Sequence, residues 1–120
     1  MVKFKNVVKA YGNHVAVKNL DLEIPEGEFV VLIGPSGCGK TTTLKMVNRL
    51  IEPTSGSIFI RGRNVMDLNP VALRREIGYV IQQIGLFPNM TIEQNIDVVP
   101  RLLGWPAEKR KRRVYELLEM

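Results

Sequence analysis

The sequence contains very little cysteine, histidine or tryptophan, and no long apolar run. Among its 120 residues there is one cysteine, Cys38, one histidine, His14, and one tryptophan. A single cysteine cannot form an internal disulfide or a cysteine-rich metal site, and it fits a reducing compartment. No apolar run is long enough to cross a bilayer, and the start Met-Val-Lys-Phe-Lys lacks the apolar stretch of a signal peptide. We therefore expect the chain in the cytosol.

The overall composition is that of one soluble globular domain, with 45% hydrophobic and 24% charged residues. The net charge of +5 comes largely from a basic run at 109–113. This run could contact nucleic acid or anionic lipid. We favour a solvated helix face instead, because no aromatic residues are interleaved for base stacking. In that helix Pro106 occupies the first turn, and three apolar side chains face inward: Val114, Leu117 and Leu118.

Residues 34–41 read Gly-Pro-Ser-Gly-Cys-Gly-Lys-Thr, a full match to the phosphate-binding loop G-x-x-x-x-G-K-[ST]. The preceding run 29–33 is apolar throughout, which is typical of a strand buried on both faces. The following residues predict a helix, because Leu44, Val47, Leu50 and Ile51 recur at helical spacing. The motif therefore lies on a strand, loop and helix unit, as a phosphate-binding loop requires.

The residue types in this loop suit the binding of a nucleoside triphosphate. Gly34, Gly37 and Gly39 permit backbone conformations that point successive N–H groups at phosphate oxygens. Lys40 can reach the same oxygens, and the Thr41 hydroxyl is placed to ligate Mg²⁺. The helix adds the positive end of its dipole.

Several other elements are predicted by local signals. The turn Gly12-Asn13 separates two apolar strands, 2–8 and 20–24, that we expect to pair antiparallel. A short strand is expected at 57–61 and a second buried strand at 77–81. Asn69-Pro70 predicts a helix start, and Thr91 with Gln94 forms a capping box before a helix whose apolar face carries Ile92, Ile96 and Val99.

Three further stretches resemble the ATP-binding subunit of an ATP-binding cassette (ABC) transporter. These are Tyr11 ahead of the loop, residues 75–82, which resemble the strand leading to the family's Q-loop, and residues 86–92. The resemblance implies that Tyr11 stacks on adenine and that Gln82 helps bind Mg²⁺ and the attacking water, with Gln83 as the lesser candidate. Lys40 and Gln82 are then the catalytic residues, and Thr41 and Gln82 the metal ligands. The implied nucleotide-binding set is Tyr11, Ala16, Gly34, Pro35, Ser36, Gly37, Cys38, Gly39, Lys40, Thr41 and Thr42.

A finer resemblance is to the importers of quaternary ammonium osmoprotectants such as glycine betaine, carnitine and choline. It rests on residues 47–56 and 98–105. It implies ATP-driven import by a cytoplasmic subunit that lies peripherally on the inner face of the plasma membrane. The implied partners are a second copy of the subunit, giving a homodimer, and transmembrane permease subunits, with no nucleic acid.

The chain also departs from the family pattern. It has no Leu-Ser-Gly-Gly-Gln signature, no apolar strand ending in Asp-Glu and no downstream switch histidine, since His14 precedes the loop. The implied fold class is α/β: the P-loop NTPase core of an ABC nucleotide-binding domain with an N-terminal antiparallel β layer, truncated early in the helical subdomain. Residues 1–85 would hold the β layer and core, and residues 86–120 the Q-loop region and the start of the helical subdomain. We expect such a chain to bind ATP without turning it over.

Three other functions stay open at this stage. The first is a small P-loop phosphotransferase. Against it, no arginine-bearing lid is evident, and such enzymes do not need the antiparallel β layer with which this chain begins. A DNA-repair ABC ATPase is another, although no sustained heptad follows the loop helix. A nucleic-acid binder acting through residues 109–113 is the third. A GTPase is disfavoured, because no Asn-Lys-x-Asp motif is present.

Overall fold

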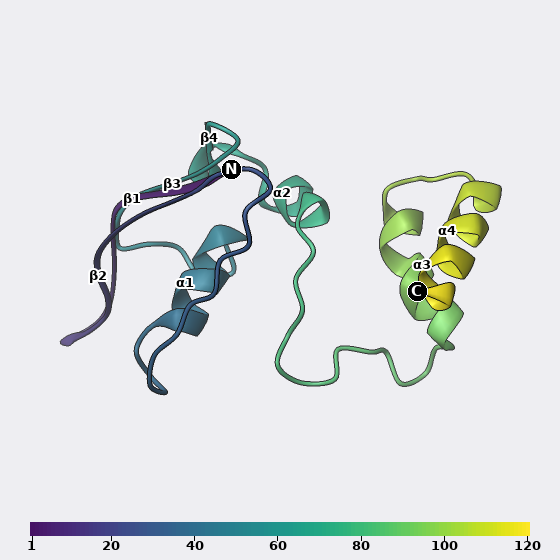
Figure 1. The fold of residues 1–120 in the computed structure, drawn as a ribbon, viewed down its shortest axis with the longest axis horizontal. Coiled ribbons are helices and arrows are strands. Elements are labelled where there is room, and N and C mark those ends of the chain that lie inside the picture. The colour runs from purple at the N-terminus through teal and green to yellow at the C-terminus, as the bar shows by residue number, and fades with distance from the viewer. The chain divides into compact units, whose positions relative to one another are not determined.

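The computed structural model describes residues 1–120, which divide into two units, Met1–Ile77 and Gly78–Met120 (Figure 1). The first unit contains the strands β1 (Val2–Tyr11), β2 (His14–Ile24), β3 (Ser55–Ile60) and β4 (Arg63–Asn64). It also contains the helix α1 (Lys40–Val47), the 3-10 helix η1 (Val65–Asp67) and the helix α2 (Pro70–Glu76). The second unit contains the helices α3 (Ile92–Leu102) and α4 (Ala107–Glu119).

The predicted N-terminal β layer is confirmed. The four strands form one antiparallel sheet in the order β2-β1-β3-β4. Tyr11 pairs with His14, so Gly12-Asn13 is the two-residue turn of a β-hairpin, as expected. His14 is exposed at the start of β2. Farther along the hairpin, Ala16 has no cross-strand partner and forms a bulge in β2.

The core of the first unit lies between this sheet and the helices. The strands contribute Phe4, Val7, Val17 and Ile58, which are all buried. Phe4 pairs directly with Ile58, so the two side chains share one face of the sheet. That face is covered by one buried apolar residue from each of the three helical segments, namely Met46 of α1, Val65 of η1 and Leu73 of α2. The loop that precedes α1 is thereby attached to a packed layer.

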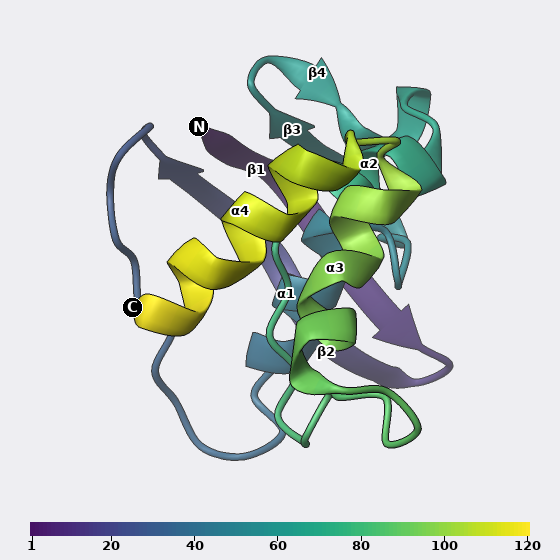
Figure 2. The ribbon, with the colours of Figure 1, turned by 90° about the vertical axis from the view of Figure 1, so that its right-hand side faces the viewer.

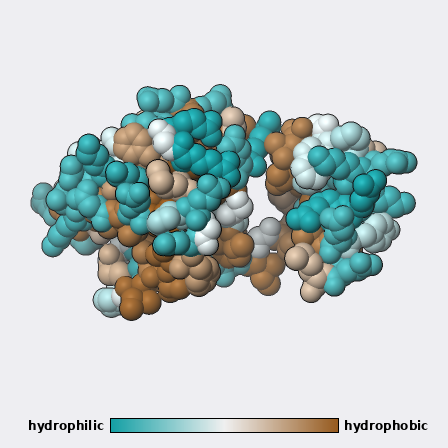
Figure 3. All heavy atoms as spheres, turned by 45° about the horizontal axis from the view of Figure 1, so that its top comes forward, coloured by the Kyte–Doolittle hydropathy of each residue, from teal (hydrophilic) through white to brown (hydrophobic).

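The two buried strands predicted at 29–33 and 77–81 are wrong. Neither segment belongs to a strand, and Phe29, Ile33 and Val80 are 91%, 88% and 96% exposed. The apolar pattern reports what a segment would bury, whereas strand formation also needs a neighbouring strand to receive its hydrogen bonds. The four strands of the sheet are all antiparallel, and none of them pairs with either segment. Figure 3 shows apolar surface gathered along the lower edge of the first unit.

The predicted loop helix is present but shorter than its apolar spacing indicates. It ends at Val47, and Leu44 and Leu50 are about half exposed. Leu50 and Ile51 instead lie in a turn after the helix, where the backbone N–H groups of both residues donate to the Lys45 carbonyl. The apolar spacing therefore extends past the end of the helix and overestimates its length.

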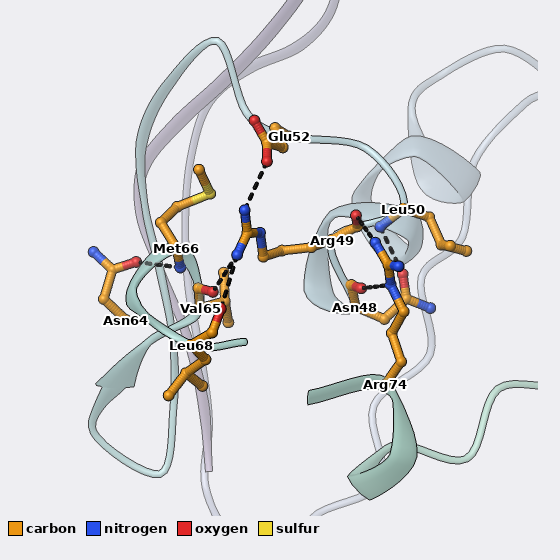
Figure 4. A network of polar contacts seen from close by, with 9 residues as sticks. All are labelled: Asn48, Arg49, Leu50, Glu52, Asn64, Val65, Met66, Leu68 and Arg74. Atoms are coloured by element: carbon orange, nitrogen blue, oxygen red, sulfur yellow. Dashed lines mark hydrogen bonds and ion pairs between the residues drawn. The ribbon is translucent and has the colours of Figure 1, made fainter. Parts of the chain in front are cut away.

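Two arginines fasten the C-terminal end of α1 to the segment that follows β4 (Figure 4). Arg74, on α2, donates from Nε to the Asn48 carbonyl at 3.0 Å and from Nη2 to the Arg49 carbonyl at 2.7 Å. Arg49 donates to the Leu68 carbonyl at 2.9 Å and pairs with Glu52 at 2.8 Å. Asn48 is the C-cap of α1 and Arg49 follows it, so these bonds fix the residues at which the helix ends.

The predicted helix caps are confirmed. The Asn69 side chain accepts from the backbone N–H groups of residues 71 and 72 at the start of α2, with Pro70 as its first residue. In the second unit, Gln94 N–H donates to the Thr91 hydroxyl at 3.1 Å, and Thr91 N–H donates to the Gln94 side chain at 2.9 Å. Both bonds of the capping box are therefore present.

In the second unit α3 and α4 lie side by side as a helical hairpin (Figures 1 and 2). Asp97 Oδ1 and Arg110 Nε are 2.9 Å apart, and neither atom has another partner. Val114 is buried as expected, but Leu117 and Leu118 are 37% and 50% exposed, so their predicted inward placement is wrong. In neither unit is there a helix with the length and apolar character to cross a membrane.

We expect Arg74→Ala to lower the free energy of unfolding by about 1–3 kcal/mol, because the carbonyls of Asn48 and Arg49, directly after α1, lose their charged donor. The matched control is Arg75→Ala on the same helix, where the side chain is exposed and a change within about 0.5 kcal/mol is expected. Urea denaturation of the two variants checks the difference. Equal losses would show that the bonds to Asn48 and Arg49 contribute nothing measurable.

Candidate functional site

The loop at residues 34–41 leads directly into α1. It turns back on itself where the Cys38 N–H donates to the Pro35 carbonyl at 3.3 Å. Gly37 and Gly39 have φ values of 81° and 98°, a region that residues with a side chain adopt at a cost. Gly39 is the N-cap of α1, and no side chain caps the helix. The first N–H groups of α1 therefore remain open to an anion.

The loop is held against the β layer by a close approach of two backbones. A Cβ on Gly39 would overlap the carbonyl oxygen of Ala16 and would lie 3.2 Å from Cγ2 of Val17. Ala16 is the bulged residue of β2, and bulges commonly re-aim the backbone beside functional sites. The bulge and the glycine together place the N-terminus of α1 directly on β2.

The ammonium of Lys40 is folded over the loop. It donates to the carbonyls of Gly34 and Pro35, the latter at 2.8 Å, and lies 3.4 Å from the Cys38 sulfur. No acidic side chain occurs in the first turn of α1. The centre of the loop is therefore positively charged. A bound anion would replace the two neutral carbonyl groups as the hydrogen-bond partner of the Lys40 ammonium.

The three threonines that follow Lys40 differ in their surroundings. Thr41 is exposed, Thr42 is half-buried and Thr43 is buried. The Thr43 hydroxyl donates to the Gly39 carbonyl at 2.8 Å, so it is already committed to the helix. Sequence reasoning did not identify this role of Thr43. The exposed Thr41 hydroxyl is the one with room for a ligand.

A cavity of about 690 Å³ lies beside the loop, within the range of small-molecule sites. Its walls come from β2, from the apolar segment before the loop and from the loop itself. The lining residues that matter here are Ala16, Val17, Val31, Gly37 and Lys40. The structure thus brings Ala16 together with the glycines and the lysine of the motif.

Tyr11 ends β1 in the same unit, and its side chain is about half exposed. The ammonium of Lys9 lies 4.9 Å from the centre of the Tyr11 ring. One face of the ring is therefore covered by a cation, a contact that sequence reasoning did not identify.

Gln82 and Gln83 belong to the second unit, where both are exposed in the segment that precedes α3. No group of three or more His, Cys, Asp or Glu side chains could hold a metal ion. Of the two residues predicted as Mg²⁺ ligands, Thr41 lies in the first unit and Gln82 in the second.

We expect Gly39→Ala to destabilise the protein more than Gly37→Ala. Both substitutions place a side chain at positive φ, at a cost of about 1–2 kcal/mol. Only the Gly39 side chain meets backbone atoms, because nothing lies within 4 Å of a Cβ on Gly37. Overpacking should add about 1–3 kcal/mol, measurable by chemical denaturation. Equal stability of the two variants would contradict the close approach to Ala16.

Comparison with known proteins gives consistent matches. The profile of the ABC transporter family matches residues 17–120. The chain is 64% identical to the glycine betaine/carnitine/choline transport ATP-binding protein OpuCA of Bacillus subtilis (strain 168), covering 100% of this chain and 32% of that protein. It is 60% identical to the osmoprotectant import ATP-binding protein OsmV of Salmonella typhimurium, covering 100% of this chain and 33% of that protein. The chain thus spans about a third of the length of these curated relatives.

Solved structures agree with the sequence matches. A dimeric structure of the ATP-binding cassette MJ0796, in a post-hydrolysis state bound to ADP and Pi, is 38% identical to this chain with a TM-score of 0.84. The match covers 99% of this chain and 56% of that one. The chain therefore belongs to the ABC transporter family.

Proposed function

We propose that this chain is the nucleotide-binding part of an ATPase subunit that powers import of a small solute. The observation that carries the proposal is the placement of Lys40, whose ammonium sits at the open N-terminus of α1 with no acidic residue in the first turn. This arrangement suits the β- and γ-phosphates of ATP, which carry negative charge and several acceptor oxygens. The loop from Gly34 to Thr42 would form the phosphate site and Tyr11 the adenine site.

The residues of this chain would act by binding and orienting the nucleotide. The N–H groups at the start of α1 and the Lys40 ammonium would hold the phosphates, and Thr41 fits Mg²⁺ because its exposed hydroxyl is a hard oxygen ligand. Bound Mg²⁺ would neutralise charge on the phosphates. Gln82 would contribute a second ligand and orient the attacking water. Phosphoryl transfer to water depends mainly on such positioning.

We propose a quaternary ammonium osmoprotectant as the solute, because the relatives named for glycine betaine, carnitine, choline or osmoprotectant transport are 60–64% identical to this chain. By the same reasoning the partners are a second copy of the subunit, supported by the dimeric cassette structures, and transmembrane permease subunits. The subunit would lie in the cytoplasm on the inner face of the plasma membrane. Residues 1–85 would be the β layer and P-loop core, and residues 86–120 the Q-loop region and the start of the helical subdomain.

The matches do not favour a small phosphotransferase or a DNA-repair ATPase, since the relatives are named as transport proteins. Contacts of the basic residues on α4 also argue for a solvated face at residues 109–113. Arg110 pairs with Asp97, Arg113 pairs with Glu116 at 3.2 Å, and the Lys109 ammonium lies 4.0 Å from the Trp105 ring. We therefore propose no nucleic-acid partner.

The central test is the affinity of Lys40→Ala for ATP and ADP in the presence of Mg²⁺. We expect about tenfold to hundredfold weaker binding, because the phosphates lose a charged hydrogen-bond donor. The control is Lys45→Ala in the last turn of the same helix, which should bind as the wild type does. Isothermal titration calorimetry measures both variants. Equal affinity in wild type and Lys40→Ala would remove the proposal.

We further expect the 120-residue chain to bind ATP while releasing phosphate at a negligible rate. No carboxylate here has the sequence context of the general base, and no signature loop is present to close the site. Each missing group typically forfeits ~10²- to 10⁴-fold in rate. A phosphate-release assay should therefore show no difference between this chain and Lys40→Ala, whereas a version extended through those motifs should show Lys40-dependent turnover. Robust Lys40-dependent turnover by the 120 residues would favour a self-sufficient NTPase.

A further inference from the structure

Lys9 and Tyr11 form a cation–π pair on β1. They are two residues apart in a strand, so their side chains lie on the same face of the sheet. The Lys9 ammonium lies 4.9 Å from the Tyr11 ring centre, within the range of an attractive contact. Lys9 itself is half-buried, whereas Tyr11 is exposed. The lysine therefore lies behind the ring rather than extending into solvent.

The strand that carries this pair is fixed in place. Between Lys9 and Tyr11, the Ala10 N–H donates to the Thr54 hydroxyl at 3.0 Å. One residue before the pair, the Val8 carbonyl accepts from Thr54 N–H at 2.8 Å. These bonds tie both sides of Lys9 to Thr54, the residue directly before β3.

The same stretch of strand is connected to the phosphate loop. Lys9 pairs directly with Val17 of β2, so the two side chains share a face. Val17 is buried against the position where Gly39 begins α1, and Ala16 beside it meets Gly39 backbone to backbone. Lys9 and Tyr11 thus extend the sheet face on which the loop rests.

We propose that Lys9 is a positioning residue for the purine base, a role that rests on the proposed function. The ammonium covers one face of the Tyr11 ring and holds the ring in one orientation, leaving the opposite face for the base. Ring orientation matters because stacked rings need an offset parallel geometry. A cation behind the ring also draws electron density away from the free face, which favours an electron-rich purine there. Lys40 would bind the phosphates, and Lys9 would act on the base through Tyr11.

The test compares ATP with inorganic triphosphate, which has the phosphates but no base. In the full chain, Lys9→Met keeps most of the apolar stem and removes the charge. We expect its ATP affinity to fall about two- to fivefold, the value of an exposed cation–π contact, while triphosphate affinity stays that of the wild type. Lys5→Met, an exposed lysine on the same strand, controls for the loss of one positive charge and should change neither affinity.

Two further variants separate positioning from folding. Lys9→Arg keeps a cation that can lie over the ring and should retain wild-type ATP affinity. In a Tyr11→Ala background, Lys9→Met should have no additional effect, because the ring through which Lys9 acts is gone. Thermal unfolding of each variant without ligand shows whether the affinity change is a stability effect.

Several outcomes would overturn the inference. Unchanged ATP affinity in Lys9→Met would do so, and so would an equal loss for inorganic triphosphate. A loss that persists undiminished in the Tyr11→Ala background would mean that Lys9 acts independently of the ring. If Lys9→Met does not fold, a Lys9→Arg variant that folds but loses ATP affinity severalfold would count against the inference. If Lys40→Ala weakens ATP binding while Lys9→Met does not, the inference about Lys9 fails but the proposed function stands.

Discussion

Gly39 lies so close to the carbonyl of Ala16 that no side chain fits between the start of α1 and β2. Two backbone irregularities make this approach possible, the positive φ of Gly39 and the bulge at Ala16. A positive φ and a bulged residue without a cross-strand partner both depart from regular backbone structure. This contact also fixes the position of Lys40, because Lys40 follows Gly39 directly and is the first residue of α1. The β layer therefore sets the geometry of the phosphate loop.

The other end of α1 is fixed by a different kind of interaction. The helix has only eight residues, of which Thr43 and Met46 are buried, so packing along its length is limited. The two residues that follow it, Asn48 and Arg49, are instead bound through the guanidinium groups of Arg49 and Arg74, which connect them to η1 and its C-cap and to α2 (Figure 4). A short helix held at both ends cannot slide or tilt without breaking one set of contacts. The open N–H groups at its start are thereby kept in one orientation, which is the preorganisation that an anion site needs.

The predictions that succeeded rest on signals contained in a few neighbouring residues. The Gly12-Asn13 hairpin turn, the Asn69 cap and the Thr91–Gln94 capping box each encode a local hydrogen-bond pattern. The strands expected at 29–33 and 77–81 failed because a strand depends on a partner elsewhere in the chain, which an apolar run does not reveal. The Ala16 bulge, the Arg74 bonds and the Lys9–Tyr11 contact were also missed. The approach of Ala16 to Gly39 and the Arg74 bonds join segments more than twenty residues apart, and the Lys9–Tyr11 contact joins side chains whose rotamers no pattern specifies.

In the proposed function, the first unit by itself would recognise both ends of a nucleotide. A nucleoside triphosphate presents an apolar, aromatic base at one end and charged phosphates at the other, and these require opposite chemistry from the protein. The hairpin of β1 and β2 supplies an exposed ring backed by a cation, and the start of α1 supplies donors and the Lys40 ammonium. The Ala16 bulge joins the two, since it lies on the hairpin and touches the helix. Gln82, to which we assign water positioning, belongs to the other unit. Base recognition would then depend on the hairpin, whereas hydrolysis would draw on Lys40 of the first unit and on Gln82 of the second.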